Sequence, residues 1–167
     1  MIALVLALAL SAPTDELPTA PFRKEHVEVR EHLAHLDAML AKLPAARRDE
    51  QRRLMTRVAS FLDEHIRTHA EWEEAKLYPA VDRRTHAGPP SFTASMRYEH
   101  RIVGRSIDEL TAMSKAETPD VTGFVRAAHR LLGLISAHFE EEEEVLLPIL
   151  YKSMTRKEFE EELGVAH

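Results

Sequence analysis

Apolar residues recur every three or four positions over four long segments of the chain, which is the spacing of one face of an α-helix. The predicted helices span roughly residues 22–43, 47–77, 93–115 and 118–147. We expect prolines to end three of them, at Pro44, Pro79 and Pro148. No segment alternates with period two for long enough to form a strand. The pattern therefore predicts an all-α fold, an antiparallel up-and-down four-helix bundle with short connections.

Two helix starts carry recognisable capping signals. Thr118-Pro119 places a proline in the first turn behind a threonine cap, so we expect the fourth helix to begin there. The run Thr155-Arg156-Lys157-Glu158 has the spacing of a capping box and predicts a short C-terminal helix that ends near Leu163. The expected organisation is a bundle over residues 21–152, followed by a short helix and tail over 153–167.

The first 20 residues are expected to form no part of the bundle. Residues 2–10 are all apolar, and small residues follow where a signal peptidase could cut. The run lacks the Lys or Arg that normally precedes such a stretch, and it is too short to span a bilayer. Residues 1–20 are therefore interpreted as a signal peptide and linker, or as an extended N-terminus. The first reading implies a periplasmic or secreted protein and the second a cytoplasmic one.

Composition narrows the chemistry that the bundle can carry. The chain has 167 residues and no cysteine, which excludes disulfides, thiolate nucleophiles, zinc ribbons and iron–sulfur ligation. The net charge is −6, and the basic residues are scattered along the chain. Without a basic patch interleaved with aromatic residues, nucleic acid is not an expected partner. Ten histidines remain as nitrogen ligands, so their positions decide whether the bundle can hold a metal.

The chain contains an internal repeat centred on histidines. His69 and His138 are each followed at the same offsets by two glutamates, a leucine and a proline: Glu73, Glu74, Leu77 and Pro79, and Glu142, Glu143, Leu146 and Pro148. The dipeptides Glu25-His26 and Glu99-His100 form a second matching pair. Two helical hairpins, roughly 22–82 and 96–151, would be related by an approximate two-fold axis. Such an arrangement brings equivalent side chains together at the centre and suits two metal ions.

In every predicted helix the apolar stripe runs directly into a histidine, and in two helices it continues into a glutamate one turn later. A buried, unpaired carboxylate costs several kcal/mol or becomes neutral, so glutamates among imidazoles are better explained as ligands of cations. Imidazole and carboxylate together suit iron, manganese or zinc. The candidate metal ligands are His26, His69, Glu73, His100, His138 and Glu142. The competing interpretation is that the acidic run 140–144 is simply a solvated helix face.

Other histidines and aromatic residues receive weaker assignments. His65 lies one turn before His69 and is either a fifth ligand, a hydrogen-bond partner of a ligand, or a core histidine. Three histidines fall off the apolar stripes and are expected at the surface: His32, His35 and His129. Two aromatic residues are expected to wall the site: Trp72 and Phe139. Two tyrosines are candidates for hydrogen bonds near the metals: Tyr78 and Tyr98.

These motifs resemble the hemerythrin-like (HHE cation-binding) domain family over about residues 22–151. The resemblance implies two non-haem iron ions joined by an oxo or hydroxo bridge, with manganese or zinc as weaker candidates. It implies that Glu73 and Glu142 bridge the irons and that the four histidines, one from each helix, complete their coordination. The expected partner is a small molecule such as O2 or NO at the metal site.

One departure from the family pattern affects the expected function. Oxygen-carrying hemerythrins have a second histidine one turn after the ligand of the third helix, where this chain has Gly104. They also have Asp, one position beyond Glu142, in the fourth helix. The departure leaves an open position, a water, or a substitute such as His65, and it counts against reversible oxygen carriage. The pattern is closer to bacterial HHE proteins implicated in iron handling, oxygen or nitric oxide sensing, and repair of iron centres.

The sequence therefore favours a stand-alone di-iron binding protein that binds or reacts with oxygen or a related small molecule. The exposed edge of the iron site is expected to face a pocket lined by Trp72, Phe139 and the space left by Gly104. One alternative is a di-iron enzyme of the peroxidase, nitric oxide or repair type; a ferritin-like oxidase is disfavoured because no histidine has an acidic residue three positions before it. The other is a metal-free helical interaction module, which predicts that Glu73 and Glu142 face solvent.

Overall fold

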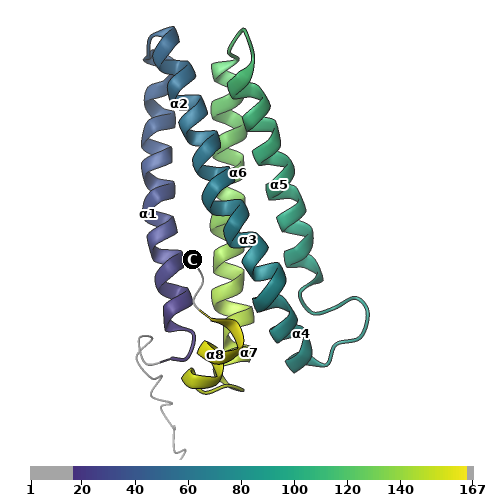
Figure 1. Cartoon of the computed structure of the whole chain (residues 1–167). Coiled ribbons are helices and arrows are strands. Elements are labelled where there is room, and N and C mark those ends of the chain that lie inside the picture. Colours follow the sequence, from purple (N-terminus) through teal and green to yellow (C-terminus); the bar gives the residue numbers. More distant parts are fainter. Residues whose placement is uncertain (1–16, 165–167) are drawn as a thin grey trace, which may run out of the picture.

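The computed structural model describes residues 17–164, so the expectations for the apolar N-terminal run lie outside the described residues. Over this range the chain is an antiparallel up-and-down four-helix bundle with one short additional helix, as Figure 1 shows. No strand occurs between residues 17 and 164. The predicted fold class is confirmed.

The first and third helices of the bundle are uninterrupted: α1 (Ala20–Lys42) and α5 (Ala94–Lys115). A 3-10 turn, η2 (Leu43–Ala45), follows α1. The second helix is a continuous run of α2 (Arg48–Phe61), η3 (Leu62–Arg67), α3 (Thr68–Trp72), η4 (Glu73–Leu77) and α4 (Tyr78–Thr85). The fourth consists of α6 (Val121–Glu141), η5 (Glu142–Leu146) and α7 (Leu147–Tyr151). The last helix is α8 (Arg156–Leu163).

None of the helices within residues 17–164 combines the length and the apolar character needed to cross a membrane.

Pro79 and Pro148 do not end their helices, which corrects the predicted boundaries. Each lies just after a π-helical turn, η4 or η5, in which the amide before the proline donates to the carbonyl five residues earlier. A proline has no N–H to continue that pattern, so the next carbonyl would lack a partner. In both repeats an arginine of a neighbouring helix reaches it: Arg23 donates to the carbonyl of Glu143 (2.6 Å), and Arg97 to that of Glu74 (3.5 Å).

The fourth helix begins at Val121 and not at Thr118, because Asp120 provides the stronger cap. Its carboxylate accepts a hydrogen bond from the backbone N–H of Gly123 (2.9 Å), and a negative charge is also favourable at a helix N-terminus. At the C-terminal end the predicted capping box is confirmed, since Thr155 and Glu158 form both of its hydrogen bonds and open α8.

The π-helical turns also change which residues face the core. A π turn contains more residues than an α turn, so a stripe extrapolated at 3.6 residues per turn slips by one position. A stripe continued from His138 and Glu142 at this spacing puts Val145 inside, but Val145 is 44% exposed while Leu146 and Leu147 are buried. In the same way Ile66, within η3, is buried, while His65 before it is exposed.

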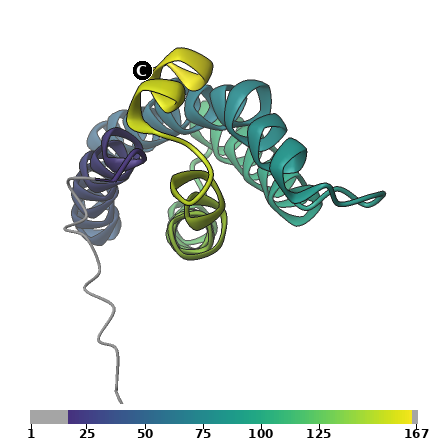
Figure 2. The ribbon, with the colours of Figure 1, turned by 90° about the horizontal axis from the view of Figure 1, so that it is seen from below.

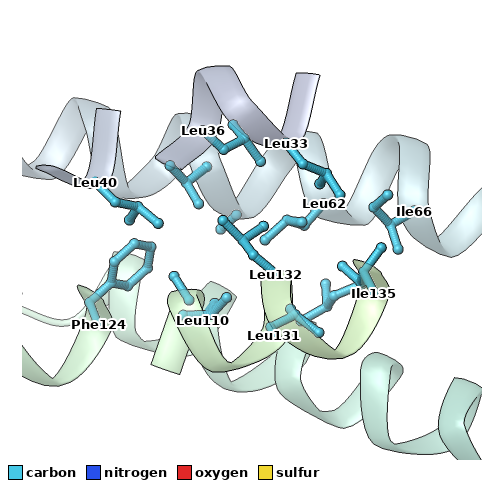
Figure 3. Close-up of a cluster of buried hydrophobic side chains, with 14 of the residues drawn as sticks. Leu33, Leu36, Leu40, Leu62, Ile66, Leu110, Phe124, Leu131, Leu132 and Ile135 are labelled. Carbon is cyan, nitrogen blue, oxygen red and sulfur yellow. The ribbon is translucent and has the colours of Figure 1, made fainter. Parts of the chain in front are cut away.

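The buried apolar side chains form two clusters along the bundle axis. The larger one contains residues of α1, η3, α5 and α6, and Figure 3 shows Leu40 and Phe124 facing each other across it. The smaller one lies at the end where α8 packs on the bundle (Figures 1 and 2), and it includes Phe22 of α1 and Phe159 of α8. Four buried polar side chains lie between the two clusters along their helices: His26, His69, Glu73 and Glu142.

Candidate metal centre

The structure brings all six predicted ligand residues together in two adjoining groups. Donor atoms of the first group lie within 4.8 Å of one another and come from α1, α3, η4 and η5: His26, His69, Glu73 and Glu142. The second group meets the same limit and comes from η4, α5 and α6: Glu73, His100 and His138. Because Glu73 belongs to both groups, the two candidate metal positions are neighbours that share a carboxylate.

Most of the centre is buried, and only His100 is partly exposed. His26, Glu73 and Glu142 are completely buried, and His69 and His138 are 4% exposed. The metal-free interaction module predicted that both glutamates face solvent, and their burial contradicts that prediction.

Most of the buried polar side-chain atoms that lack a hydrogen-bond partner lie in this centre. Within residues 17–164 seven such atoms occur, and five of them belong to four candidate ligands: Nε2 of His26, Nε2 of His69, both carboxylate oxygens of Glu73, and Oε2 of Glu142. Buried polar groups normally find partners, so a cluster of unpartnered electron-pair donors is what ligands of a cation would present. Imidazole nitrogen and carboxylate oxygen are both suitable donors for a divalent transition metal. The residues therefore fit a pair of metal ions.

Donor atoms of the first group converge on a single point. Nε2 of His69 lies 2.8 Å from Oε1 of Glu73, and Nε2 of His26 lies 3.8 Å from the same oxygen. Oε2 of Glu142 is 3.4 Å from Nε2 of His26. These donor atoms come from three different helices and face a common point, which is the arrangement expected around a metal.

The second group has a similar arrangement around the other oxygen of Glu73. Oε2 of Glu73 lies 3.1 Å from Nε2 of His100 and 4.0 Å from Nε2 of His138. The two Nε2 atoms are 2.9 Å apart. Oε1 of Glu142 lies 3.6 Å from Nε2 of His138. Glu73 and Glu142 thus each direct one oxygen toward each group, as a bridging carboxylate does.

A ring of carboxylates holds the four histidines by their outer nitrogens. Nδ1 donates to a glutamate in each case: His69 to Glu25 (2.8 Å), His138 to Glu99 (2.8 Å), His26 to Glu143 (2.9 Å) and His100 to Glu74 (3.2 Å). An ionised carboxylate can only accept, so these bonds make each Nδ1 a donor and turn every Nε2 inward. Sequence reasoning assigned these four glutamates no role, although the repeated Glu-His and Glu-Glu pairs are the signal that could have identified them.

Burial and charge shift the protonation of the centre strongly. Burial opposes protonation of His69, but Glu73 and Glu25 outweigh it and raise the pKa of His69 to about 10. Burial would raise the pKa of Glu73, yet the neighbouring histidines hold it well below its usual range. Burial, together with the charge of Glu73, raises the pKa of Glu142 well above its usual range. Without a cation, the centre therefore neutralises itself by retaining protons on His69 and Glu142.

The weaker assignments have mixed outcomes. Trp72 is half-buried and stacks on Phe22. Phe139 walls the site as expected, since its ring stacks on that of His26 with centroids 4.1 Å apart. The three histidines predicted at the surface are indeed exposed: His32, His35 and His129. His65 is also exposed and packs against Phe61, so it belongs to neither donor group. Tyr98 is 53% exposed, which does not fit the hydrogen bonds expected of it near the metals.

Tyr78, in contrast, lies inside the centre. It is completely buried, and its hydroxyl donates to Oε1 of Glu142 (2.9 Å). Burial, together with the charges of Glu73 and Glu142, raises the pKa of Tyr78.

A pocket of about 630 Å³ reaches the centre from the α3 and α5 side. Its lining includes Ala70, Gly104 and His100, so the expected space beside Gly104 is present. Trp72 and Phe139 do not line it, which corrects the predicted pocket wall. Phe139 packs flat on His26 of α1 instead, away from the α3 and α5 side.

Comparison with known proteins identifies the family. The family model described as the hemerythrin HHE cation-binding domain matches residues 17–150, which is most of the chain. Searches of curated proteins and of solved structures found no match. The family match, together with two buried groups of histidine and glutamate donors, shows that the chain is a cation-binding domain of this kind. The chain belongs to the hemerythrin HHE cation-binding domain family.

Proposed function

We propose that this protein binds two non-haem iron ions and that this di-iron centre binds or reacts with O2 or a related small molecule such as NO. The observation that carries the proposal is the pair of buried donor groups that share Glu73 and contain five unpartnered donor atoms. Two histidines and two carboxylate oxygens for each ion form a hard-to-borderline donor set without thiolate, and iron accepts such a set readily.

Each iron would be held by one histidine from each of two helices. His26 and His69 would hold the first ion, and His100 and His138 the second, with Glu73 and Glu142 offering one oxygen to each. When bound, the pair of irons supplies redox chemistry toward diatomic molecules that no side chain of this chain provides. The protein contributes the position, charge and solvation of the centre.

The pocket supplies a route for a small molecule to the second iron position. It is lined on one side by the imidazole of His100 and on another by apolar surface of Val103 and Ile107. Gly104 contributes no side chain, so the passage beside His100 stays open. On the opposite side of the centre the Phe139 ring lies over His26 and excludes solvent. A diatomic ligand therefore enters from the α3 and α5 side.

The direct test is metal analysis with an absorption spectrum of protein purified in air. We expect about two irons per chain and the charge-transfer bands of an oxo-bridged iron pair. Removing and readmitting O2 on the reduced sample then distinguishes reversible binding from irreversible oxidation, and NO is tested in the same way. A chain that carries zinc alone, or no metal, after reconstitution with iron(II) contradicts the proposal.

The same samples distinguish a binder from an enzyme. In a binding protein each di-iron centre reacts once with O2, NO or peroxide and then stops. Steady-state turnover of peroxide or NO with a suitable reductant would assign the chain to the di-iron enzymes instead.

A further inference from the structure

We propose that Tyr78 is a direct ligand of the second iron position, the one held by His100 and His138. The inference rests on the proposed di-iron function and adds a residue to it. It makes the two metal positions chemically different, because only the second would carry a phenolate oxygen.

The phenol oxygen of Tyr78 lies among the other donors of this position. It is 3.0 Å from Nε2 of His100, 3.2 Å from Nε2 of His138 and 2.9 Å from Oε1 of Glu142. Donor atoms that sit about 2.1 Å from one metal and at right angles to each other are about 3.0 Å apart. The tyrosine oxygen therefore occupies a place that adjacent ligands of a single ion take.

The two imidazoles point toward the phenol oxygen. Nδ1 of His138 donates to Glu99 and Nδ1 of His100 donates to Glu74, so each Nε2 faces Tyr78. The hydroxyl of Tyr78 donates to Glu142. Three electron-rich atoms thus face one another at about 3 Å, and a cation at their centre relieves the repulsion between their lone pairs.

The side chain of Tyr78 is also held rigidly. Its ring stacks on that of His100 with centroids 5.1 Å apart. The guanidinium of Arg97, from the neighbouring helix α5, lies 5.2 Å from the centroid of the tyrosine ring. Tyr78 also directly follows the π-helical turn η4, which sets the direction of its side chain. A ligand fixed in this way loses little conformational entropy when a metal binds.

The repeat shows that this oxygen is an addition to the symmetric centre. Tyr78 lies nine residues after His69, and Leu147 lies nine residues after His138. Leu147 is also completely buried but offers no donor atom. The first iron position is therefore held by imidazole and carboxylate alone, while the second adds a phenol and adjoins the pocket.

The test uses the iron(III) form of the full chain and of Tyr78→Phe. As the phenolate–iron bond forms, the O–H bond breaks and the proton leaves to solvent. The wild type is expected to hold two irons and to show a broad visible phenolate-to-iron(III) absorption, with tyrosine ring modes enhanced in the resonance Raman spectrum. Tyr78→Phe is expected to keep its iron and lose both signals. Tyr98→Phe is the matched control, because Tyr98 is exposed, and it should retain them.

A second measurement tests the assignment even if Tyr78→Phe does not fold. Wild-type protein grown with ring-deuterated tyrosine should show the enhanced modes shifted to lower frequency. Two irons per chain without phenolate bands, or bands that persist in Tyr78→Phe, overturn the assignment of Tyr78 and leave the di-iron proposal intact. Failure of the wild type to bind iron overturns both.

Discussion

Replacing Glu73 with glutamine provides the sharpest test of the centre, because this one side chain serves both metal positions. One carboxylate oxygen lies 2.8 Å from His69 and the other 3.1 Å from His100. Glutamine has nearly the same shape, but it removes the negative charge and replaces one donor oxygen with an N–H₂ group that cannot ligate. Loss of a hydrogen-bond partner of a ligand already costs 10–100-fold in metal affinity. Loss of a bridging ligand should cost about 100-fold or more at each position, or ~2.8 kcal/mol.

This loss is measurable as a change in metal-induced stabilisation. At a free metal concentration of 100 times the wild-type Kd, each bound ion adds about 2.7 kcal/mol to the free energy of unfolding. If the variant's Kd is 100-fold higher, the same concentration adds about 0.4 kcal/mol. For a chain of this size each bound ion should therefore raise the Tm by roughly 5–11 °C in the wild type, and by about 1–2 °C in Glu73→Gln.

The assay is thermal unfolding followed by circular dichroism, with and without zinc(II), which requires no control of redox state. Iron content after reconstitution is measured in parallel. Glu144→Gln, an exposed change within the π-helical turn η5, is the matched control and should behave as the wild type. Two irons per chain and an unchanged zinc-induced rise in Tm for Glu73→Gln would refute the claim that Glu73 joins the two positions.

Three further outcomes are expected. Glu25→Gln removes the negative charge of the acceptor that orients His69, so metal affinity measured by competition with a chelator should fall about 10–100-fold. Exposed Glu28→Gln should change nothing. Gly104→Ala should raise the free energy of unfolding in urea by about 0.5–1 kcal/mol with iron content unchanged, because its new β-carbon would meet only Nη1 of Arg67, at 3.5 Å. Nearby carboxylates hold the pKa of His69 at about 10 against the effect of burial. The contribution of His69 to the free energy of unfolding of the metal-free protein should therefore be complete below about pH 6.5 and decline toward pH 10, by at most ~1.4 kcal/mol per pH unit. A flat profile between these pH values contradicts this.

The metal-loaded protein provides the control for the pH prediction. Once a cation holds the imidazole and carboxylates of the centre, it replaces the protons that stabilise the metal-free form. Its free energy of unfolding should therefore not decline between pH 6.5 and 10.

The π-helical turns mark where sequence periodicity stopped being sufficient. A stripe drawn at 3.6 residues per turn assigned His65 and Val145 to the interior, but both are exposed. Each extra residue in a π turn shifts the buried face by one position, and no local propensity signals such a turn. Local sequence also could not predict that the helices continue past Pro79 and Pro148, because this depends on hydrogen bonds from Arg97 and Arg23 of other helices.

The sequence by itself determined the bundle and the members of the two donor groups. A repeated apolar spacing defines helices wherever it occurs, and repeated His and Glu at matched offsets define equivalent positions on those helices.

Only the tertiary structure decided how these positions meet. It joined the two groups through Glu73, arranged four outer glutamates around the histidines, and placed Tyr78 but not His65 beside the second position. The physical reason is that a helix face is a local property of the chain. Distances between side chains on different helices depend instead on the crossing of all four, and on π turns that exist because packing and buried polar partners stabilise them.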